Sequence, residues 1–131
     1  MLDTNACIGA IRRTSPVVLD RLREHSPGDV AISQIVQFEL EYGACHSQQP
    51  QRNRARLEHF LRYIEAVDWG KKQSREAAKI RCELGRSGRP IGPYDVLIAA
   101  HARSIEATLV THNTRELAHV PGLVIEDWEL P

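Results

Sequence analysis

The chain has 131 residues, 42% of them hydrophobic and 26% charged, and its formal net charge is zero. This composition favours one ordinary globular domain over residues 1–131. Because the net charge is zero, the chain has no overall positive electrostatic potential that would indicate a nucleic-acid partner. No apolar run approaches the roughly 20 residues of a membrane-spanning helix, and no export leader is visible, so we expect a cytoplasmic protein without membrane contact. The three cysteines lack metal-type spacing, which indicates reduced thiols in the core: Cys7, Cys45 and Cys82.

Short β-like segments alternate with helical patterns along the chain. In chain order we predict a strand at 1–3, a helix from near Ala6, a helix at 16–25, a strand at 30–33, helices at 33–46 and 51–63, a strand at 65–68, helices at 71–86 and 94–104, and strands at 107–111 and 123–126. Ser15 with Pro16, and later Ser33, are typical helix starts. This alternation indicates an α/β sandwich around a mostly parallel sheet.

Polar residues follow two predicted strands and begin one helix. Asp3 ends the first strand, Asn113 follows the strand that ends in "TLVT", and Asp95 lies in the first turn after Gly92-Pro93. Because parallel α/β sheets bind ligands at the carboxyl ends of their strands, these side chains could share one rim.

Each of these residues also has a purely structural interpretation. Asp3 could cap the helix that begins near Ala6, and a helix dipole favours Asp95 in a first turn. Asn113 with Glu116 fits a capping-box pattern. The combination of acids from separate segments is a stronger signal than any one of them.

Glu39 is a sharper signal, because it interrupts an apolar stripe on the helix predicted at 33–46. The polar side chains of this helix recur at three-and-four spacing: Ser33, Gln34, Gln37 and Glu41. Glu39 lies among Val36, Tyr42 and other apolar neighbours, where an unpaired carboxylate is costly. The structural alternative is a half-exposed side chain at the edge of the stripe. We expect Glu41 to be solvated and dispensable.

Converging carboxylates repel one another unless a cation neutralises them or their pKa values rise. Oxygen ligands without histidine or cysteine spacing favour Mg²⁺, with Mn²⁺ as the alternative, over zinc. Such ions typically act on phosphates. Elsewhere, residues 70–92 hold seven bases and two acids, which predicts either a local basic surface or a solvated helix face.

Four motifs run in order through nearly the whole chain: "MLDTNACI", "FELEYGA", "IGPYDVLIAAHA" and "LVTHNTREL…VPGLVIEDW". Together they closely resemble the PIN-domain ribonucleases, specifically the VapC toxins of toxin–antitoxin pairs. The resemblance implies a three-layer α/β/α sandwich in which Asp3, Glu39 and Asp95 hold the metal. The family often has Asp at the position of Asn113, so the fourth site residue is Asn113, Glu116 or a water. Thr4 and Thr111 match hydroxyl positions that line the site.

The resemblance implies a Mg²⁺-dependent endoribonuclease that hydrolyses phosphodiester bonds of structured RNA such as tRNA or rRNA. It also implies a homodimer and a small VapB-type antitoxin, whose peptide lies in a groove and sends a side chain into the acidic site. The bases expected to bind RNA are Lys71, Lys72, Arg75, Arg86 and Arg89. His101 lies on an apolar helix and is expected to be packed, and His112 is expected to be an incidental loop residue.

Two other classes of function remain open at this point. A non-catalytic PIN-like module could bind RNA or protein without metal, and Asn113 is the feature that favours it. A metal-dependent phosphatase also places Asp after its first strand, but it typically needs a second Asp two residues later. Asn5 stands there instead, so this fit is poor.

Overall fold

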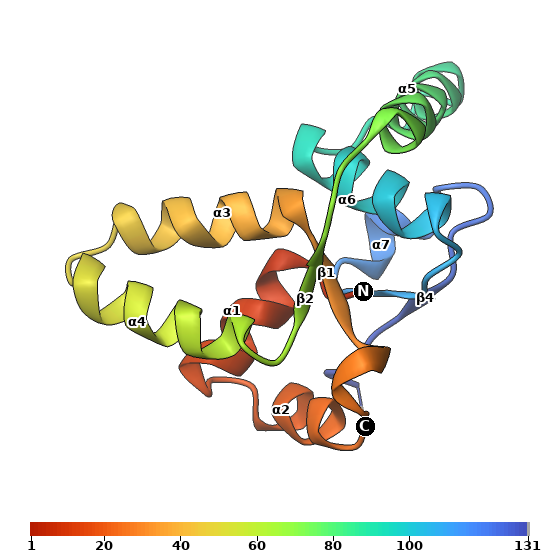
Figure 1. Cartoon of the computed structure of the whole chain (residues 1–131). Coiled ribbons are helices and arrows are strands. Elements are labelled where there is room, and N and C mark those ends of the chain that lie inside the picture. Colours follow the sequence, from red (N-terminus) through yellow and green to blue (C-terminus); the bar gives the residue numbers. More distant parts are fainter. Residues whose placement is uncertain (131) are drawn as a thin grey trace.

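The structure is a computed structural model that describes residues 1–130. Helices and short strands alternate along the chain (Figure 1). In chain order they are α1 Thr4–Arg12, α2 Pro16–Arg23, the 3-10 turn Pro27–Asp29, β1 Ala31–Ser33, α3 Gln34–Cys45, α4 Pro50–Leu61, β2 Glu65–Val67, α5 Lys71–Arg86, α6 Pro93–Ser104, β3 Leu109–Val110, α7 Thr114–Leu117 and β4 Ile125–Glu126.

All the strand pairings are parallel. β1 pairs with β2, and β3 pairs with β4. Leu2 forms parallel bridges to Ile32 and to Val110, so it joins the two pairs in the order β2, β1, Leu2, β3, β4. The mostly parallel sheet expected from the alternation of elements is therefore confirmed.

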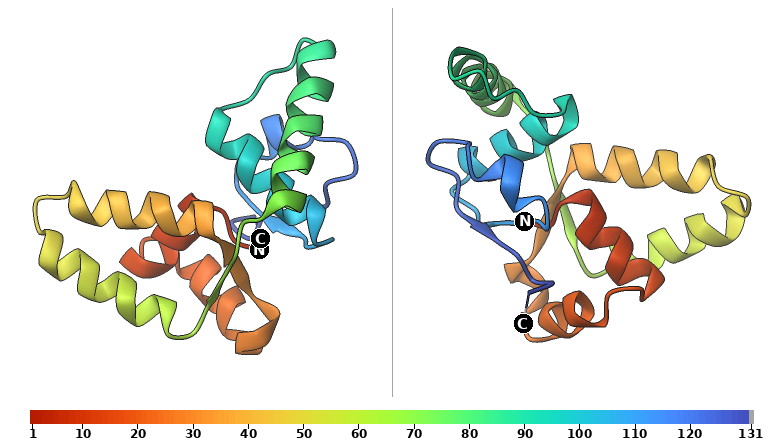
Figure 2. Two further views of the ribbon diagram at one scale, coloured as in Figure 1. Left: turned by 45° about the horizontal axis from the view of Figure 1, so that its top comes forward. Right: turned by 180° about the vertical axis from the view of Figure 1, so that it is seen from behind.

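The helices form two layers around this sheet. α1 to α4 lie on one side of the strands, and α5 to α7 lie on the other (Figure 2). Leu2, Ile32 and Leu109 are fully buried at the centre. Burying a side chain of this size contributes about 1.5–3 kcal/mol each, so the central strands hold the layers together. The α/β/α arrangement agrees with the prediction.

The predicted elements are all present, but the strands are shorter than expected. The strand expected at 1–3 is a single bridge at Leu2, and the one expected at 107–111 is reduced to Leu109–Val110. Each strand pairs over only two or three residues before its chain turns away. α5 has the predicted bounds, whereas the 3-10 turn Pro27–Asp29 was not anticipated.

Two expectations about burial are wrong. Of the three cysteines only Cys7 is buried, while Cys45 and Cys82 are exposed. Tyr42, assigned to an apolar face, is 60% exposed, because α3 and α4 form a hairpin that projects from the sheet (Figure 1). α6 is buried nearly all round, as its sequence indicated. Among the described residues no helix has the length and apolarity needed to cross a membrane.

Candidate active site

Asp3 lies at the centre of the sheet edge, immediately after the Leu2 bridge. Its backbone N–H donates to the Val110 carbonyl at 3.0 Å, and its side chain is almost fully buried. Oδ1 accepts a hydrogen bond from the Ala6 N–H at 2.8 Å, so Asp3 is the N-cap of α1. The capping interpretation of Asp3 is therefore correct, and the second carboxylate oxygen makes no cap bond.

Glu39 is tied to the same edge by α1. The Thr4 hydroxyl donates to Glu39 Oε1 at 2.7 Å, joining residues 35 positions apart in the chain. Glu39 is partly buried, and the buried face of α3 beside it consists of Val36, Leu40 and Ala44. The Thr4 hydroxyl thus orients the Glu39 carboxylate. Glu41, expected to be solvated, is itself only partly exposed.

Asp95 completes the group from the first turn of α6. Burial raises the pKa of Asp95, and the neighbouring charges of Asp3 and Glu116 raise it further. Burial also raises the pKa of Asp3, against the hydrogen bonds from Ala6 and the Thr111 hydroxyl that lower it. Asp3 therefore lies close enough to both Glu39 and Asp95 for their charges to interact, in line with the convergence expected from the sequence.

The segment after β3 brings Asn113 and Glu116 beside this group. Asn113 stands at the N-cap position of α7, but its side chain makes no cap bond, so the capping-box expectation is wrong. Its backbone N–H bonds to the Thr111 hydroxyl at 3.0 Å, which fixes the turn. Its amide instead donates to Glu116 Oε2 at 3.3 Å. Glu116 carries the charge that acts on Asp95, and Asn113 contacts Glu116.

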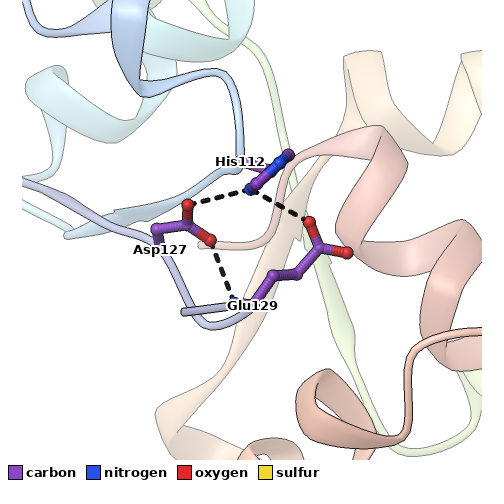
Figure 3. A group of neighbouring side chains, drawn as sticks. All are labelled: His112, Asp127 and Glu129. Atoms are coloured by element: carbon purple, nitrogen blue, oxygen red, sulfur yellow. Dashed lines mark hydrogen bonds and ion pairs between the residues drawn. The ribbon is translucent and has the colours of Figure 1, made fainter. Parts of the chain in front are cut away.

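A further acid, Glu129, was missed by the sequence analysis. Its charge raises the pKa of Asp3, so it also faces the site. His112 Nδ1 lies 2.9 Å from Asp127 Oδ2 and 3.1 Å from Glu129 Oε2 (Figure 3). The hydrogen bond to Asp127 raises the pKa of His112. His112 is thus paired with the C-terminal segment. The run of acids after Pro121 was the available signal.

The basic residues expected to bind RNA lie outside the acidic group. Lys71, Lys72, Arg75 and Arg86 are exposed on α5. Arg89, in the loop that leads to α6, lies with Nη1 at 2.9 Å from His119 Nε2. Because this loop runs directly into α6, the Arg86 end of α5 is close to Asp95 along the chain, and the Lys71 end is remote.

A large groove lies apart from the acids. It has a volume of about 850 Å³ and lies between α1, α2 and α4, with Leu19, Leu22 and Phe60 in its lining. A smaller cavity of about 70 Å³ next to it includes Glu39. The two cavities share Ile11, Arg12 and Arg56. The small cavity that includes Glu39 therefore adjoins the groove across these three side chains.

Comparison with known proteins adds independent evidence. The PIN domain family model matches residues 1–123. The tRNA(fMet)-specific endonuclease VapC of Shigella flexneri is 44% identical over 98% of this chain and 96% of its own length. Ribonuclease VapC2 of Rickettsia felis is 38% identical over 98% of this chain and 97% of its own.

Solved structures agree with these relatives. The VapBC complex of Salmonella typhimurium bound to DNA contains a chain with a TM-score of 0.93 and 41% identity, over 98% of this chain and 96% of that one. The VapBC2 complex of Rickettsia felis, bound to a promoter fragment, matches with a TM-score of 0.92 and 37% identity, over 98% and 97%. With the acids of α1, α3 and α6 at one edge of a parallel sheet, this chain belongs to the PIN-domain family, among its VapC endoribonucleases of toxin–antitoxin pairs.

Proposed function

We propose that this chain hydrolyses RNA phosphodiester bonds with Mg²⁺ held by Asp3, Glu39 and Asp95. The observation that carries the proposal is the convergence on Asp3: the charge of Glu39 raises the pKa of Asp3, and the charge of Asp3 raises the pKa of Asp95. Buried carboxylates of like charge are stabilised by a divalent cation, and an all-oxygen donor set suits Mg²⁺ or Mn²⁺. When bound, the ion supplies Lewis acidity that activates the attacking water and offsets charge on the phosphate.

The chain's own residues orient this site. The Ala6 amide holds one oxygen of Asp3, which fixes the direction of the other. The Thr4 hydroxyl holds Oε1 of Glu39, leaving Oε2 to ligate the cation or to accept a proton from the attacking water. Glu116, rather than Asn113, is our candidate for the fourth acid, because its charge acts on Asp95. Asn113 and Thr111 position it through the turn after β3.

Cleavage of purified RNA tests the proposal. We expect discrete products with Mg²⁺ and none with EDTA. Asp3→Asn should slow cleavage by about 100-fold or more, as removal of a group that stabilises a transition state does. Glu41→Gln is the matched control, because Glu41 lies on the same helix as Glu39 and makes no hydrogen bond in the described residues. Mg²⁺-independent RNA binding without cleavage would instead support the non-catalytic module.

The substrate we propose is a structured RNA, of which tRNA is the leading class. Two relatives that cover nearly the whole chain bear the name tRNA(fMet)-specific endonuclease. The exposed bases of α5 offer a surface for the RNA backbone, and the loop with Arg89 extends this surface toward Asp95. Sequence-specific nucleases of RNA typically read unpaired bases in loops, so a stem-loop is the form we expect.

The proposed partner is a small VapB-type antitoxin bound in the groove between α1, α2 and α4. Solved relatives are complexes named VapBC. The groove combines an apolar floor with five arginines and contains no acid: Arg12, Arg13, Arg23, Arg52 and Arg56. An amphipathic peptide with apolar and acidic side chains fits this lining, and the adjoining cavity would lead its end to Glu39.

We also propose that the chain forms a homodimer. Phe38 and Tyr42 on α3 and Tyr94 on α6 are 53%, 60% and 46% exposed. Phe38 and Tyr94 contact each other, with ring centroids 5.9 Å apart. Exposed aromatic side chains that gather in this way are typical of the centre of a protein interface.

A further inference from the structure

A buried hydrogen bond joins α6 to the start of α3. His101 of α6 and Ser33, which precedes α3, are both fully buried, and His101 Nδ1 lies 2.6 Å from Ser33 Oγ. Ser33 ends β1 and is the N-cap of α3, with its Oγ accepting the Ile35 N–H at 3.0 Å. Among the described residues this is the one side-chain hydrogen bond between α6 and the β1–α3 segment.

The pattern of partners assigns the protons. Ser33 Oγ already accepts the Ile35 amide, and a serine hydroxyl has a single proton to donate. If that proton goes to Nδ1, the ring carries its own proton on Nε2, and only this Nε2–H is left without a hydrogen-bond partner. If Nδ1 were the donor, both the hydroxyl proton and the Nε2 lone pair would be unsatisfied. The first arrangement is favoured, because unpaired buried polar groups are costly.

The surroundings of Nε2 fit this assignment. Nε2 is buried and has no hydrogen-bond partner among the described residues. The Trp69 ring stands perpendicular to the imidazole, with centroids 5.5 Å apart, and an N–H can point at an aromatic face in such a pair. Burial also lowers the pKa of His101, which keeps the ring neutral. His101 is therefore a fixed acceptor for the Ser33 hydroxyl.

This contact stands between two proposed metal ligands. Glu39 follows Ser33 by six residues on α3, and Asp95 precedes His101 by six residues on α6. Each carboxylate is therefore about 9 Å along its helix from the contact. A rotation of about 10° at the contact would displace a carboxylate by about 1.6 Å, and misplacement of about 1 Å can cost 100-fold in rate.

We propose that His101 is a positioning residue of the nuclease. Through Ser33 it fixes α6, which carries Asp95, relative to α3, which carries Glu39. Thr4 already links Glu39 to the segment of Asp3, whereas the described residues make no hydrogen bond to the Asp95 carboxylate. The inference rests on the proposed function, since it concerns the spacing of the acids in that site.

Two variants separate positioning from simple stability. His101→Phe keeps an aromatic ring but removes the acceptor, while His101→Asn keeps a polar group near the place of Nδ1. Mg²⁺ affinity is measured by calorimetry without RNA, and the half-saturating Mg²⁺ for cleavage is measured well below each variant's Tm. We expect His101→Phe to lower the Mg²⁺ affinity, and to raise the half-saturating Mg²⁺ concentration, by about 10-fold or more. This is the size typical of losing a group that orients a ligand. His101→Asn should restore most of the loss.

The result that would overturn the inference is a His101→Phe protein with a lower Tm but unchanged Mg²⁺ affinity and cleavage. Equal losses in His101→Phe and His101→Asn would also overturn it. If His101→Phe fails to fold, Ser33→Ala replaces it, with Ser15→Ala as the control because Ser15 makes no cap bond. Asp95→Asn separates the two hypotheses: if it binds Mg²⁺ and cleaves like the wild type, the proposed function itself fails.

Discussion

At the residue scale, the carboxylates of the site oppose folding when no cation is bound. Burial and neighbouring acids raise the pKa values of Asp3 and Asp95. The position of Asp95 in a first helical turn favours its charge by about 0.3–1 kcal/mol, yet the direction of its shift means that burial and repulsion outweigh this effect. A raised pKa in the folded state destabilises the fold once the pH exceeds that pKa.

We therefore predict that Asp95→Asn raises the Tm of the metal-free protein at neutral pH while it abolishes cleavage. The expected rise is a few degrees, since about 1 kcal/mol shifts the Tm of a domain of this size by about 4 °C. Thermal melts across pH would check the sign. The difference should shrink as the pH falls and disappear below about pH 3, where the carboxyl is protonated in both folded and unfolded chains.

Magnesium supplies the internal control for these melts. A cation that binds the folded state raises its Tm, so Mg²⁺ should stabilise the wild type and have little effect on Asp95→Asn. Glu41→Gln should leave both the melt and the magnesium response unchanged. A metal-free Asp95→Asn protein that melts below the wild type at neutral pH would show that the carboxylate stabilises the fold instead.

At the scale of elements, α5 offers a test of where RNA lies. Its 16 residues span about 24 Å, and the end with Lys71 and Lys72 packs near Ser104, at the end of α6 opposite Asp95. We predict that the double variant Arg86→Ala/Arg89→Ala weakens RNA binding about 10-fold at physiological salt. Lys71→Ala/Lys72→Ala is the matched control and should have a smaller effect, because its end of the helix is far from Asp95.

The salt dependence of RNA binding, measured in the inactive Asp3→Asn background, shows whether the loss of affinity comes from lost phosphate contacts. Each lost phosphate contact should reduce the slope of log affinity against log salt by about 0.7 for single-stranded RNA. Two lost contacts would therefore reduce it by about 1.4. An affinity loss at an unchanged slope would point to a distorted loop, and equal effects of the two double variants would place the RNA along the whole helix.

The elements also show how far the sequence can be interpreted. α5 was predicted to its ends, because its apolar spacing and flanking glycines define it locally. The strands were overestimated, since pairing depends on neighbours that the local pattern does not contain. Asp3, Glu39 and Asp95 were proposed from a strand end, a broken apolar stripe and a first helical turn, and all three are local signals. Glu129 was not, because its approach to Asp3 depends on how the C-terminal segment returns beside β3.

At the scale of the whole molecule, the proposed binding surfaces are formed by different sets of helices. The arginine-lined groove belongs to α1, α2 and α4, and the exposed aromatic pair belongs to α3 and α6. α3 carries Glu39 as well as Phe38 of the aromatic pair, and it packs against α1 and α4, which line the groove. In a chain of zero net charge, a groove with five arginines and no acid is a local concentration of positive charge.

We predict that Arg56→Glu disrupts binding of the proposed VapB-type antitoxin. Arg56 lines both the groove and the cavity that contains Glu39. A reversed charge there would therefore repel an acidic peptide in either place. We expect affinity to fall by at least 10-fold in calorimetric titration, because like charges at an interface cost several kcal/mol. Arg62→Glu, exposed at the end of α4 and outside the groove lining, should bind as the wild type does.

Sedimentation of the same samples reports the mass of the free chain, which should correspond to two copies. Equal affinity of the two variants would place the antitoxin on another surface, and the aromatic face of α3 and α6 would then be the next to test.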